Sequence, residues 1–503
     1  MSKIFEAILA AERWLNGVVW GWPMIIFILG TGILLTIRTR AMQVRKLGES
    51  INSTIVPTLK SVGKPHHEDK HAKSVSQFEA FAAAISGTVG TGNIVGVVSA
   101  ILTGGPGAVF WMWVSAFFGM ITNYAENVLG LFYRKKDKDG NFSGGAFYYI
   151  KHGLGKGWGW LAYLAAIFCL FAALGMSGVQ TNKITQTLSS SIGDTTTVKL
   201  IIGGAVALVT ALIILGGIQR IGKVASLLVP FMSLLFIVLS LIGVFMNVSA
   251  VPMAFKLIFT NIFGFKAMAG GFGGYLFAQV IKKGMARGVF SNEAGLGSSV
   301  IAHSASETRE PVKQGLWGIF EVFFDTFIIC TMTALIFLTT FIKSGQIETF
   351  TSTTPDAATS MLAFSTNFGV FGTICFSTIL PLFAFTTIMA WSYYGEKAVE
   401  FCFAPLKETG KKIAVVVFKL IYLAMIVGAA VIESDILWNI SDTANGLMAI
   451  PNLIAVVLLS GKVVKITKNY YARKKGEQVE PMLSAYPEQN AEFAADLKEM
   501  DGE

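Results

Sequence analysis

The stretch Ser86-Gly-Thr-Val-Gly-Thr-Gly-Asn93 lies inside an apolar segment, Phe78–Leu102, that is long enough to cross a bilayer. Glycine and hydroxyl residues are least expected at that depth, because hydrocarbon offers no water to pair with free backbone amides and carbonyls. Irregular backbone persists there only where it is buried in protein or lines a ligand cavity. The stretch therefore predicts a broken transmembrane helix, an element with which many secondary transporters bind substrate and coupling ion.

The composition of the whole chain indicates a membrane protein. Of 503 residues, 53% are hydrophobic and only 14% are charged, and the mean hydropathy is +0.60. A soluble domain carries about 25% charged residues. With a window of about 19 residues, we predict an all-α integral membrane protein of about eleven transmembrane helices. The predicted spans are Val18–Ile37, Phe78–Leu102, Ala108–Phe132, Trp158–Ser177, Val198–Leu215, Val224–Met246, Ala267–Met285, Leu316–Ile342, Phe368–Val399, Ile413–Ile432 and Gly446–Val464.

The distribution of basic residues predicts the orientation. Met1–Trp14 has mixed charge and no convincing cleavage site, so we expect the first span to be retained. If the N-terminus is outside, 31 Lys and Arg residues fall in inside segments and seven in outside segments. This bias is the positive-inside pattern. We therefore expect a multi-pass protein of the bacterial plasma (inner) membrane with a cytoplasmic C-terminus, and the net charge of +9 does not indicate nucleic-acid binding.

One leading helix followed by two repeats of five helices is the organisation that we predict. Because five is odd, the repeats enter the membrane in opposite directions, which gives an inverted repeat. The first helix of each repeat should be the broken one, and the second break is predicted either at Gly270–Gly274 or nearer Ala278–Gly284. The predicted regions are an N-terminal helix and basic loop (1–76), the first repeat (77–247), the second repeat (248–464) and a basic-then-acidic tail (465–503).

Five blocks of sequence, in order along nearly the whole chain, resemble the alanine or glycine:cation symporter family. They are Gly87–Gly96, Gly104–Gly119 (GGPGAVFWMWVSAFFG), Arg287–Ser298 (RGVFSNEAGLGS), Trp391–Lys397 (WSYYGEK) and Ala449–Leu453 (AIPNL). The resemblance implies a sodium-coupled symporter that imports alanine, glycine or similar small neutral amino acids by alternating access. It also implies the five-plus-five fold of bacterial leucine transporters, with sodium as coupling ion and no other cofactor. We expect the monomer to be functional.

The break in the first repeat helix is the expected substrate site. A half-helix N-terminus presents free amides and a positive dipole end to a carboxylate. The amides of Thr91 and Gly92 are candidates for this role, and Gly90 would allow close approach. The Thr88 carbonyl would face the substrate amine, and Asn93 would brace the break or contact the ligand. The alternative for this glycine-rich stretch is close packing of transmembrane helices.

Similarity to the wider superfamily also implies a sodium site. The carbonyls of Ser86 and Val89 should face the ion, together with the hydroxyls of Thr386 and Thr387 and the carbonyl of Phe383. Neutral oxygens suit sodium because it is a hard cation.

Four further residues are expected around the substrate. Gln180, at the end of the fourth span, is a candidate for a substrate hydrogen bond, and its alternative is an amide reaching the outer interface. Thr387 and Trp391 lie one turn apart on one helix face. Trp391 would wall the pocket, unless it belongs to an interfacial aromatic belt. Trp391 and Ile281 are predicted to limit substrate size.

Charged residues at membrane depth are functional candidates. Glu321 and Asp325, one turn apart in the eighth span, could relay protons, line a cation path or form a hydrogen-bonded brace. Glu126 with Asn123, and separately Glu293, are predicted to brace helix ends. Lys282 and Lys283 are predicted to anchor the inside end of a span, although a longer helix would bring one of them toward the cavity.

Other function classes have weaker support. The sequence contains no Gly-x-Ser-x-Gly motif and no nucleotide-binding Gly-x-x-x-x-Gly-Lys-Ser/Thr motif, so an enzyme or primary pump is not expected. A proton-coupled transporter and a cation channel stay open as alternatives. A metal site in His66–His71 is disfavoured because it lies in a basic loop, and the acidic stretch 477–503 is expected to be solvated and poorly ordered.

Overall fold

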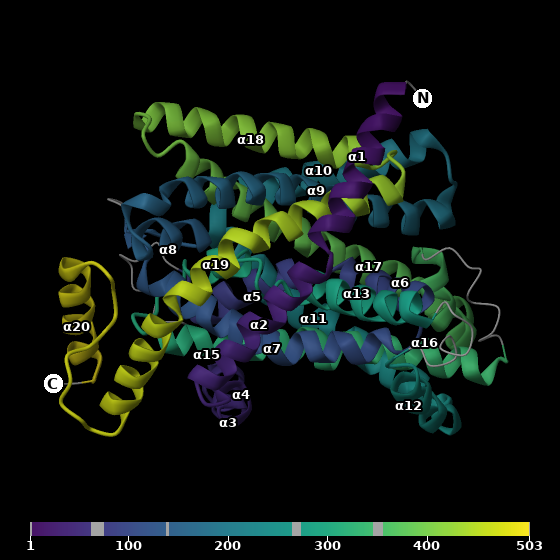
Figure 1. Ribbon diagram of the computed structural model, residues 1–503. Coiled ribbons are helices and arrows are strands. Elements are labelled where there is room, and N and C mark those ends of the chain that lie inside the picture. The colour runs from purple at the N-terminus through teal and green to yellow at the C-terminus, as the bar shows by residue number, and fades with distance from the viewer. Residues whose placement is uncertain (1–2, 62–74, 137–139, 264–272, 346–355, 502–503) are drawn as a thin grey trace.

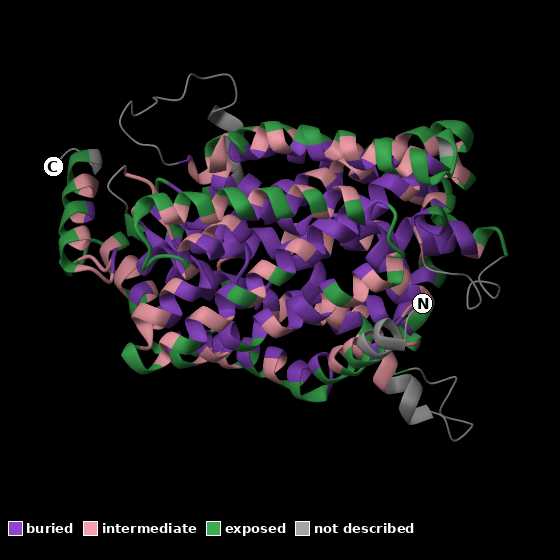
Figure 2. Cartoon of the chain, turned by 90° about the horizontal axis from the view of Figure 1, so that it is seen from above, coloured by how far each residue is buried: buried purple, intermediate pink, exposed green. Residues whose placement is uncertain are grey.

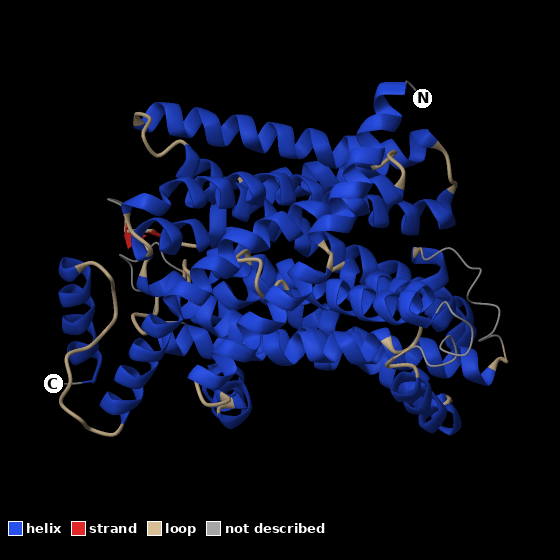
Figure 3. Cartoon of the chain, viewed as in Figure 1, coloured by secondary structure: helices blue, strands red, loops and turns tan. Residues whose placement is uncertain are grey.

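The computed structural model describes residues 3–61, 75–136, 140–263, 273–345 and 356–501, which are almost entirely helical (Figure 1, Figure 3). In this part of the chain, strand is confined to the antiparallel pair β1 (Lys135–Lys136) and β2 (Phe142–Ser143). Nine described helical segments are long and apolar enough to cross a membrane, and one bent helix pair could form a further span. The predicted all-α membrane fold is confirmed.

The helices follow the predicted order of one leading span and two sets of five. The leading span is α1 (Lys3–Val19) with α2 (Trp22–Arg38), followed by the short helices α3 (Met42–Arg45) and α4 (Leu47–Ser61). The first set is α5 (Gln77–Thr88), η1 (Gly92–Gly96) and α6 (Val97–Gly104), then α7 (Ala108–Phe132), α9 (Gly159–Ile192), α10 (Thr196–Ile214) and α11 (Gly217–Met246). Between α7 and α9 lie α8 (Ala146–Gly153) and η2 (Lys156–Trp158).

The second set follows η3 (Val248–Ala250) and α12 (Val251–Thr260). Its members are α13 (Gly273–Asn292) with α14 (Ser299–His303), the continuous span α15 (Pro311–Val322), η5 (Phe323–Cys330) and α16 (Thr331–Lys343), and then α17 (Ala357–Cys402), α18 (Glu408–Ala429) and α19 (Ser434–Lys474). The chain ends with α20 (Pro487–Asp501).

The count of eleven spans is not confirmed, since the described residues give nine, or ten with the bent pair. The helix α13, in the place of the predicted seventh span, is not among those ten. Its three basic residues, Lys282, Lys283 and Arg287, lower its hydropathy, and the predicted residues that precede Gly273 lie outside the described part of the chain.

Burial separates an inner group of helices from an outer one (Figure 2). In the most apolar window of α7, 67% of residues are buried, against 17% in α10 and 22% in α18. The outer helices expose apolar side chains such as Leu208, Leu212 and Leu420. Exposed apolar surface on this scale is not expected of a soluble monomer, so α10 and α18 present the faces that fit lipid.

The first predicted break is present. The helix α5 begins at a capping box in which Ser76 and Glu79 satisfy each other's backbone amides. It ends at Thr88, because Val89 adopts an extended conformation (φ −80°, ψ 90°). The helix resumes at Gly92, and the helical segments before and after the break are bent by 47° relative to each other.

A second break is present, but it does not lie at Ala278–Gly284, one of its two predicted positions. Ala278–Gly284 lies inside the continuous helix α13, which begins at Gly273, and residues 270–272 lie outside the described part of the chain. The helix ends at Asn292, and Glu293, Gly295 and Gly297 then adopt positive φ values of 54°, 91° and 74°. Left-handed residues of this kind end a helix. The hydropathy window did not locate this break, because the break follows the part of α13 that carries the basic residues.

The prediction that Lys282 and Lys283 anchor an inside helix end is also wrong. Arg287 lies one turn further along α13 and lines a cavity together with Arg13. Because Arg13 was predicted to lie outside, this end of α13 lies on the same side as the predicted outside residues. Lys283 approaches Gly104, at the far end of α6. We call the side of the molecule that holds Arg13 and the start of α19 the vestibule face. The opposite side, which holds α8, the end of α19 and α20, is the tail face (Figure 1).

The acidic tail is ordered in the part that the structure describes, contrary to the prediction. The helix α20 buries Phe493 against Phe142 and Leu483. Asp496 accepts a hydrogen bond from Arg309 at 2.7 Å. The prediction failed because it used the acidic composition of the tail as a whole. Two apolar residues in the tail, Leu483 and Phe493, pack against the loops of the tail face. The predicted His66–His71 cluster lies outside the described residues.

Candidate functional site

Two backbone amides leave the helical ladder at the first break. The Gly90 amide donates to Asn93 Oδ1 at 2.8 Å, and the Thr91 amide donates to Gln180 Oε1 at 3.2 Å. Both acceptors are side chains that replace carbonyls of the preceding turn. Thr88 is buried at the last helical position, where its hydroxyl donates to the Ile85 carbonyl at 3.1 Å. The break is therefore held open by side chains and enclosed in protein, as membrane burial requires.

Gly90 is the point of closest approach between the break and α17. A Cβ atom at this position would lie 2.5 Å from Thr387 Oγ1 and 3.3 Å from the amide group of Gln180. At Gly92 a Cβ atom would lie 3.0 Å from the ring of Phe290. Glycine is required at Gly90 for space, because its neighbours leave no room for a methyl group.

Two polar atoms at the break have no hydrogen-bond partner among the described residues. They are Thr91 Oγ1 and Gln180 Nε2, and both residues are at most 1% exposed. Leaving a buried donor unpaired costs about 1–3 kcal/mol. A ligand with acceptor groups would remove this cost, so the pair fits a polar substrate. Gln180 therefore does not reach the outer interface, and that alternative is wrong.

Oxygen atoms from α5 and α17 converge next to the break. The Thr387 hydroxyl lies 3.0 Å from the Ser86 carbonyl and 3.1 Å from the Phe383 carbonyl. Thr386 Oγ1 lies 2.9 Å from the same Phe383 carbonyl. These are four of the five residues predicted for the sodium site, and Val89 is buried in the break beside them. The donor set is neutral oxygen, which suits a hard monovalent cation.

Asp325 joins both breaks through one carboxylate. Its Oδ1 accepts from Asn93 Nδ2 at 2.5 Å, and its Oδ2 accepts from Ser291 Oγ and Thr326 Oγ1, each at 2.8 Å. The π-helical segment η5 carries Asp325, and π-helical turns occur often at functional sites. Thr333 also donates to the Asn93 carbonyl at 2.8 Å.

Glu321, one turn before Asp325, belongs to a different network. Its Oε2 lies 2.7 Å from His303 Nε2, and His303 Nδ1 lies 2.7 Å from Gln314 Nε2. These three side chains are buried. The two acids therefore do not form one chain of contacts, and Glu321 braces the end of α14.

The second break is braced by two buried carboxylates, as predicted for Glu126 and Glu293. Glu293 accepts from Trp391 Nε1 at 2.9 Å and from Ser298 Oγ at 2.6 Å. Glu126 accepts from the Gly295 amide at 3.3 Å and from Asn452 Nδ2. Trp391 is fully buried, so the alternative of an interfacial belt residue is wrong.

The structure does not bring Ile281 to the site. It lies eleven residues before the end of α13 at Asn292, which corresponds to about 16 Å along a helix. Phe290, which we did not predict, takes the place beside the break instead. Had the second break been placed after Asn292, the last turn of α13 would have identified Phe290 and Ser291 as neighbours of the first break.

Aromatic and charged side chains separate the break from the vestibule face. Phe290 and Trp438 have ring centroids 5.0 Å apart, and the Arg287 guanidinium lies 4.5 Å from the Trp438 ring centroid. Arg287 also forms an ion pair with Asp442 at 3.1 Å. Beyond them lies a cavity of about 320 Å³ that includes Ser99 in its lining. This layer closes the site on that side.

Comparison with known proteins agrees with this geometry. The sodium:alanine symporter family matches residues 5–484. The chain belongs to this family. It is 40% identical over 469 residues to the sodium/alanine symporter AgcS of Methanococcus maripaludis, covering 92% of this chain and 97% of AgcS. It is also 34% identical to the amino-acid carrier protein AlsT of Bacillus subtilis, covering 92% of each.

A solved structure supports the fold of this symporter family member. MhsT in complex with L-phenylalanine aligns with a TM-score of 0.53 at 13% identity, covering 79% of this chain and 99% of MhsT. MhsT has the fold of bacterial leucine transporters, so the predicted five-plus-five inverted repeat is confirmed. The chain is therefore a multi-pass membrane transporter for amino acids, and not an enzyme.

Proposed function

We propose that this symporter imports small neutral amino acids, such as alanine or glycine, together with sodium. The observation that carries the proposal is the pair of unpartnered atoms, Thr91 Oγ1 and Gln180 Nε2, next to the oxygen cluster around Thr387. A zwitterion and a cation could then occupy adjacent positions at one break. The named substrate of the relative AgcS supports alanine.

The substrate carboxylate would take the place of the Gln180 side-chain oxygen. Gln180 Oε1 accepts from the Thr91 amide, so a carboxylate oxygen can satisfy the same donor once the glutamine side chain turns. The Gly92 amide would supply a second donor at the start of the half-helix. The Thr88 carbonyl would accept from the substrate amine. In this arrangement Asn93 holds the break and does not contact the substrate.

We also propose that the vestibule face is outside and the tail face is cytoplasmic, in the bacterial inner membrane. Moving Lys282, Lys283 and Arg287 to the outside count still leaves a large excess of Lys and Arg inside. The functional unit would be one chain, since every residue of the break and the oxygen cluster comes from the same polypeptide.

Replacement of Thr387 by valine tests the sodium site. The variant keeps the shape of the side chain but removes the hydroxyl that lies within 3.1 Å of the Ser86 and Phe383 carbonyls. We expect the half-saturating sodium concentration for alanine uptake into proteoliposomes to rise about tenfold or more. Thr378→Val on the same helix is the control, because the Thr378 hydroxyl donates to the Ile374 carbonyl in its own preceding turn. Unchanged sodium dependence in Thr387→Val would refute the assigned ion site.

Proton coupling is the second candidate, and the buried carboxylate of Asp325 between the two breaks favours it. An imposed proton gradient without sodium should drive alanine uptake if protons are sufficient. Under the proposed sodium coupling, uptake should follow the sodium gradient and saturate with alanine. Saturation also separates a transporter from a channel.

Trp391→Ala is expected to relax the size limit of the site. The indole lies one turn beyond Thr387 and donates to Glu293, so it fills the space between the ion cluster and the second break. Its removal should allow leucine or phenylalanine to compete with alanine for uptake, because apolar pockets select substrates mainly by exclusion. Competition assays in proteoliposomes measure this. Trp160→Ala, at a side chain that is 62% exposed, is the control, and the same selectivity as wild type in Trp391→Ala would contradict the prediction.

A further inference from the structure

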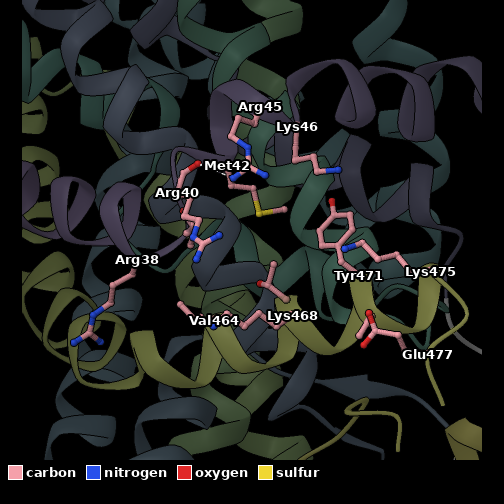
Figure 4. Close-up of a pocket in the computed structure, with 13 residues that line it drawn as sticks. Arg38, Arg40, Met42, Arg45, Lys46, Val464, Lys468, Tyr471, Lys475 and Glu477 are labelled. Carbon is pink, nitrogen blue, oxygen red and sulfur yellow. Dashed lines mark hydrogen bonds between the residues drawn. The ribbon is translucent and has the colours of Figure 1, made fainter. Parts of the chain in front are cut away.

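A cavity of about 470 Å³ opens on the tail face, at the other end of α19 from the vestibule (Figure 4). The end of α2, the turn into α3 and the last turns of α19 form its walls. Its lining is strongly basic, with a single acidic residue, Glu477. The basic residues are Arg38, Arg40, Arg45, Lys46, Lys468 and Lys475.

Most of this positive charge is not neutralised by the protein. Among the described residues, Lys46 alone of the six forms an ion pair, with Glu49 at 2.6 Å. Arg38 donates to Ser460 Oγ at 2.5 Å, and Arg45 donates to the Arg40 carbonyl at 3.1 Å. Like charges that converge on one hollow repel each other. An anion in the cavity would relieve this repulsion and accept hydrogen bonds from several guanidinium and ammonium groups.

The turn that presents Arg40 is strained. Arg40 and Ala41 have φ values of 58° and 53°, in the left-handed region. The Ala41 amide donates to the Thr36 carbonyl at 2.7 Å, and the Arg40 amide donates to the Ile37 carbonyl at 3.1 Å. This pairing is a Schellman motif, in which glycine is the usual residue at the position of Arg40. An arginine that holds a glycine position at a conformational cost points to a use for its side chain.

The surroundings of the cavity fit a lipid better than a free anion. Ile37 is 71% exposed on the last turn of α2, and Leu458 is 53% exposed on α19, less than two turns before Val464 in the cavity lining. An apolar surface that borders a basic hollow at a helix end matches a phospholipid, with its acyl chains on the helices and its phosphate in the hollow. Basic pockets between transmembrane helices on the cytoplasmic side bind such head groups.

We propose that this cavity binds the phosphate of an anionic phospholipid headgroup from the leaflet on the tail face. The bound lipid would bridge the end of α2 and the end of α19. Phosphatidylglycerol is the probe for this site, with the full-length protein purified in detergent. Binding is measured from the rise in melting temperature as the lipid is titrated, since a ligand that binds the folded state stabilises it.

The variant Arg40→Gln/Lys468→Gln removes two basic groups that are exposed and form no ion pair among the described residues. Each surface basic group contributes about 1 kcal/mol to attraction by anionic lipid, so the half-maximal phosphatidylglycerol concentration should rise about 30-fold. The control Lys407→Gln/Lys412→Gln removes the same charge at the start of α18 and should behave as wild type. Identical titrations of the Arg40/Lys468 variant and wild type would overturn the proposal.

A variant with the opposite expected effect covers the case in which the double variant is poorly folded. Glu477→Gln removes the acidic residue from the lining, so it should lower the half-maximal concentration about fivefold. An unchanged value in Glu477→Gln would count against the site. An equal stabilisation by phosphatidylcholine, or by inorganic phosphate at the same concentration, would also overturn the assignment to an anionic lipid.

Discussion

Replacing Gly90 with alanine is expected to reduce alanine uptake about 100-fold while the protein still folds. The new methyl group would lie 2.5 Å from Thr387 Oγ1. That hydroxyl cannot move away freely, because it is held by the Ser86 and Phe383 carbonyls. Overpacking of this kind costs about 1–3 kcal/mol, and here the strain falls on the oxygen atoms proposed to hold sodium. Initial rates of sodium-driven uptake into proteoliposomes measure the loss.

Gly204→Ala is the matched control for this substitution. Gly204 lies in α10, and a Cβ atom at its position would meet no atom within 4 Å. Alanine is also the better helix former, so this variant should transport normally. Wild-type uptake by Gly90→Ala would show that the oxygen cluster tolerates a displaced Thr387, and the proposed site would then be wrong. A melting temperature close to that of wild type is needed to separate lost transport from lost folding.

The first break could be predicted because its signal is local. Glycine or hydroxyl residues occupy most of Ser86–Asn93, and their neighbours on both sides are apolar enough for membrane insertion. Backbone chemistry alone then requires an irregular, enclosed segment. The second break carries a similar mixture in Ser291–Ser298, but the hydropathy window placed the end of its helix too early. A search for mixed glycine and polar runs would have found both.

The contacts that complete the site could not be predicted in the same way. The Thr91 amide and Gln180 are separated by 89 residues, Arg287 and Asp442 by 155. Such pairs depend on how helices that are distant in the sequence pack within each repeat, which no local pattern specifies. Gln180 was found from its polarity at a span end, whereas Asp442 carried no such signal. The docked tail was missed for a related reason, because its two anchoring residues, Leu483 and Phe493, are few among acidic neighbours.

Asp325→Asn is expected to lower sodium-driven uptake more than 100-fold. The carboxylate accepts hydrogen bonds from Asn93, Ser291 and Thr326. An asparagine in its place offers one acceptor oxygen and a donor amide, so at least one of the three donors would face another donor. Each hydrogen bond to a charged group contributes about 1.5–3 kcal/mol, and a loss of about 3 kcal/mol corresponds to more than 100-fold.

The Asp325→Asn substitution should impair transport specifically, because Asp325 connects the two helix breaks, which must move together during alternating access. Asn93 holds the Gly90 amide, and Ser291 belongs to the last turn of α13, so a single carboxylate keeps both breaks in register. Asp194→Asn is the control, since Asp194 is an exposed side chain in the loop before α10.

Comparing gradient-driven uptake with alanine counterflow then separates two roles of Asp325. If Asp325 carries a coupling proton, counterflow should survive in Asp325→Asn while proton-driven uptake is lost. If it fixes the breaks, both should fall together, and unchanged uptake would exclude either role.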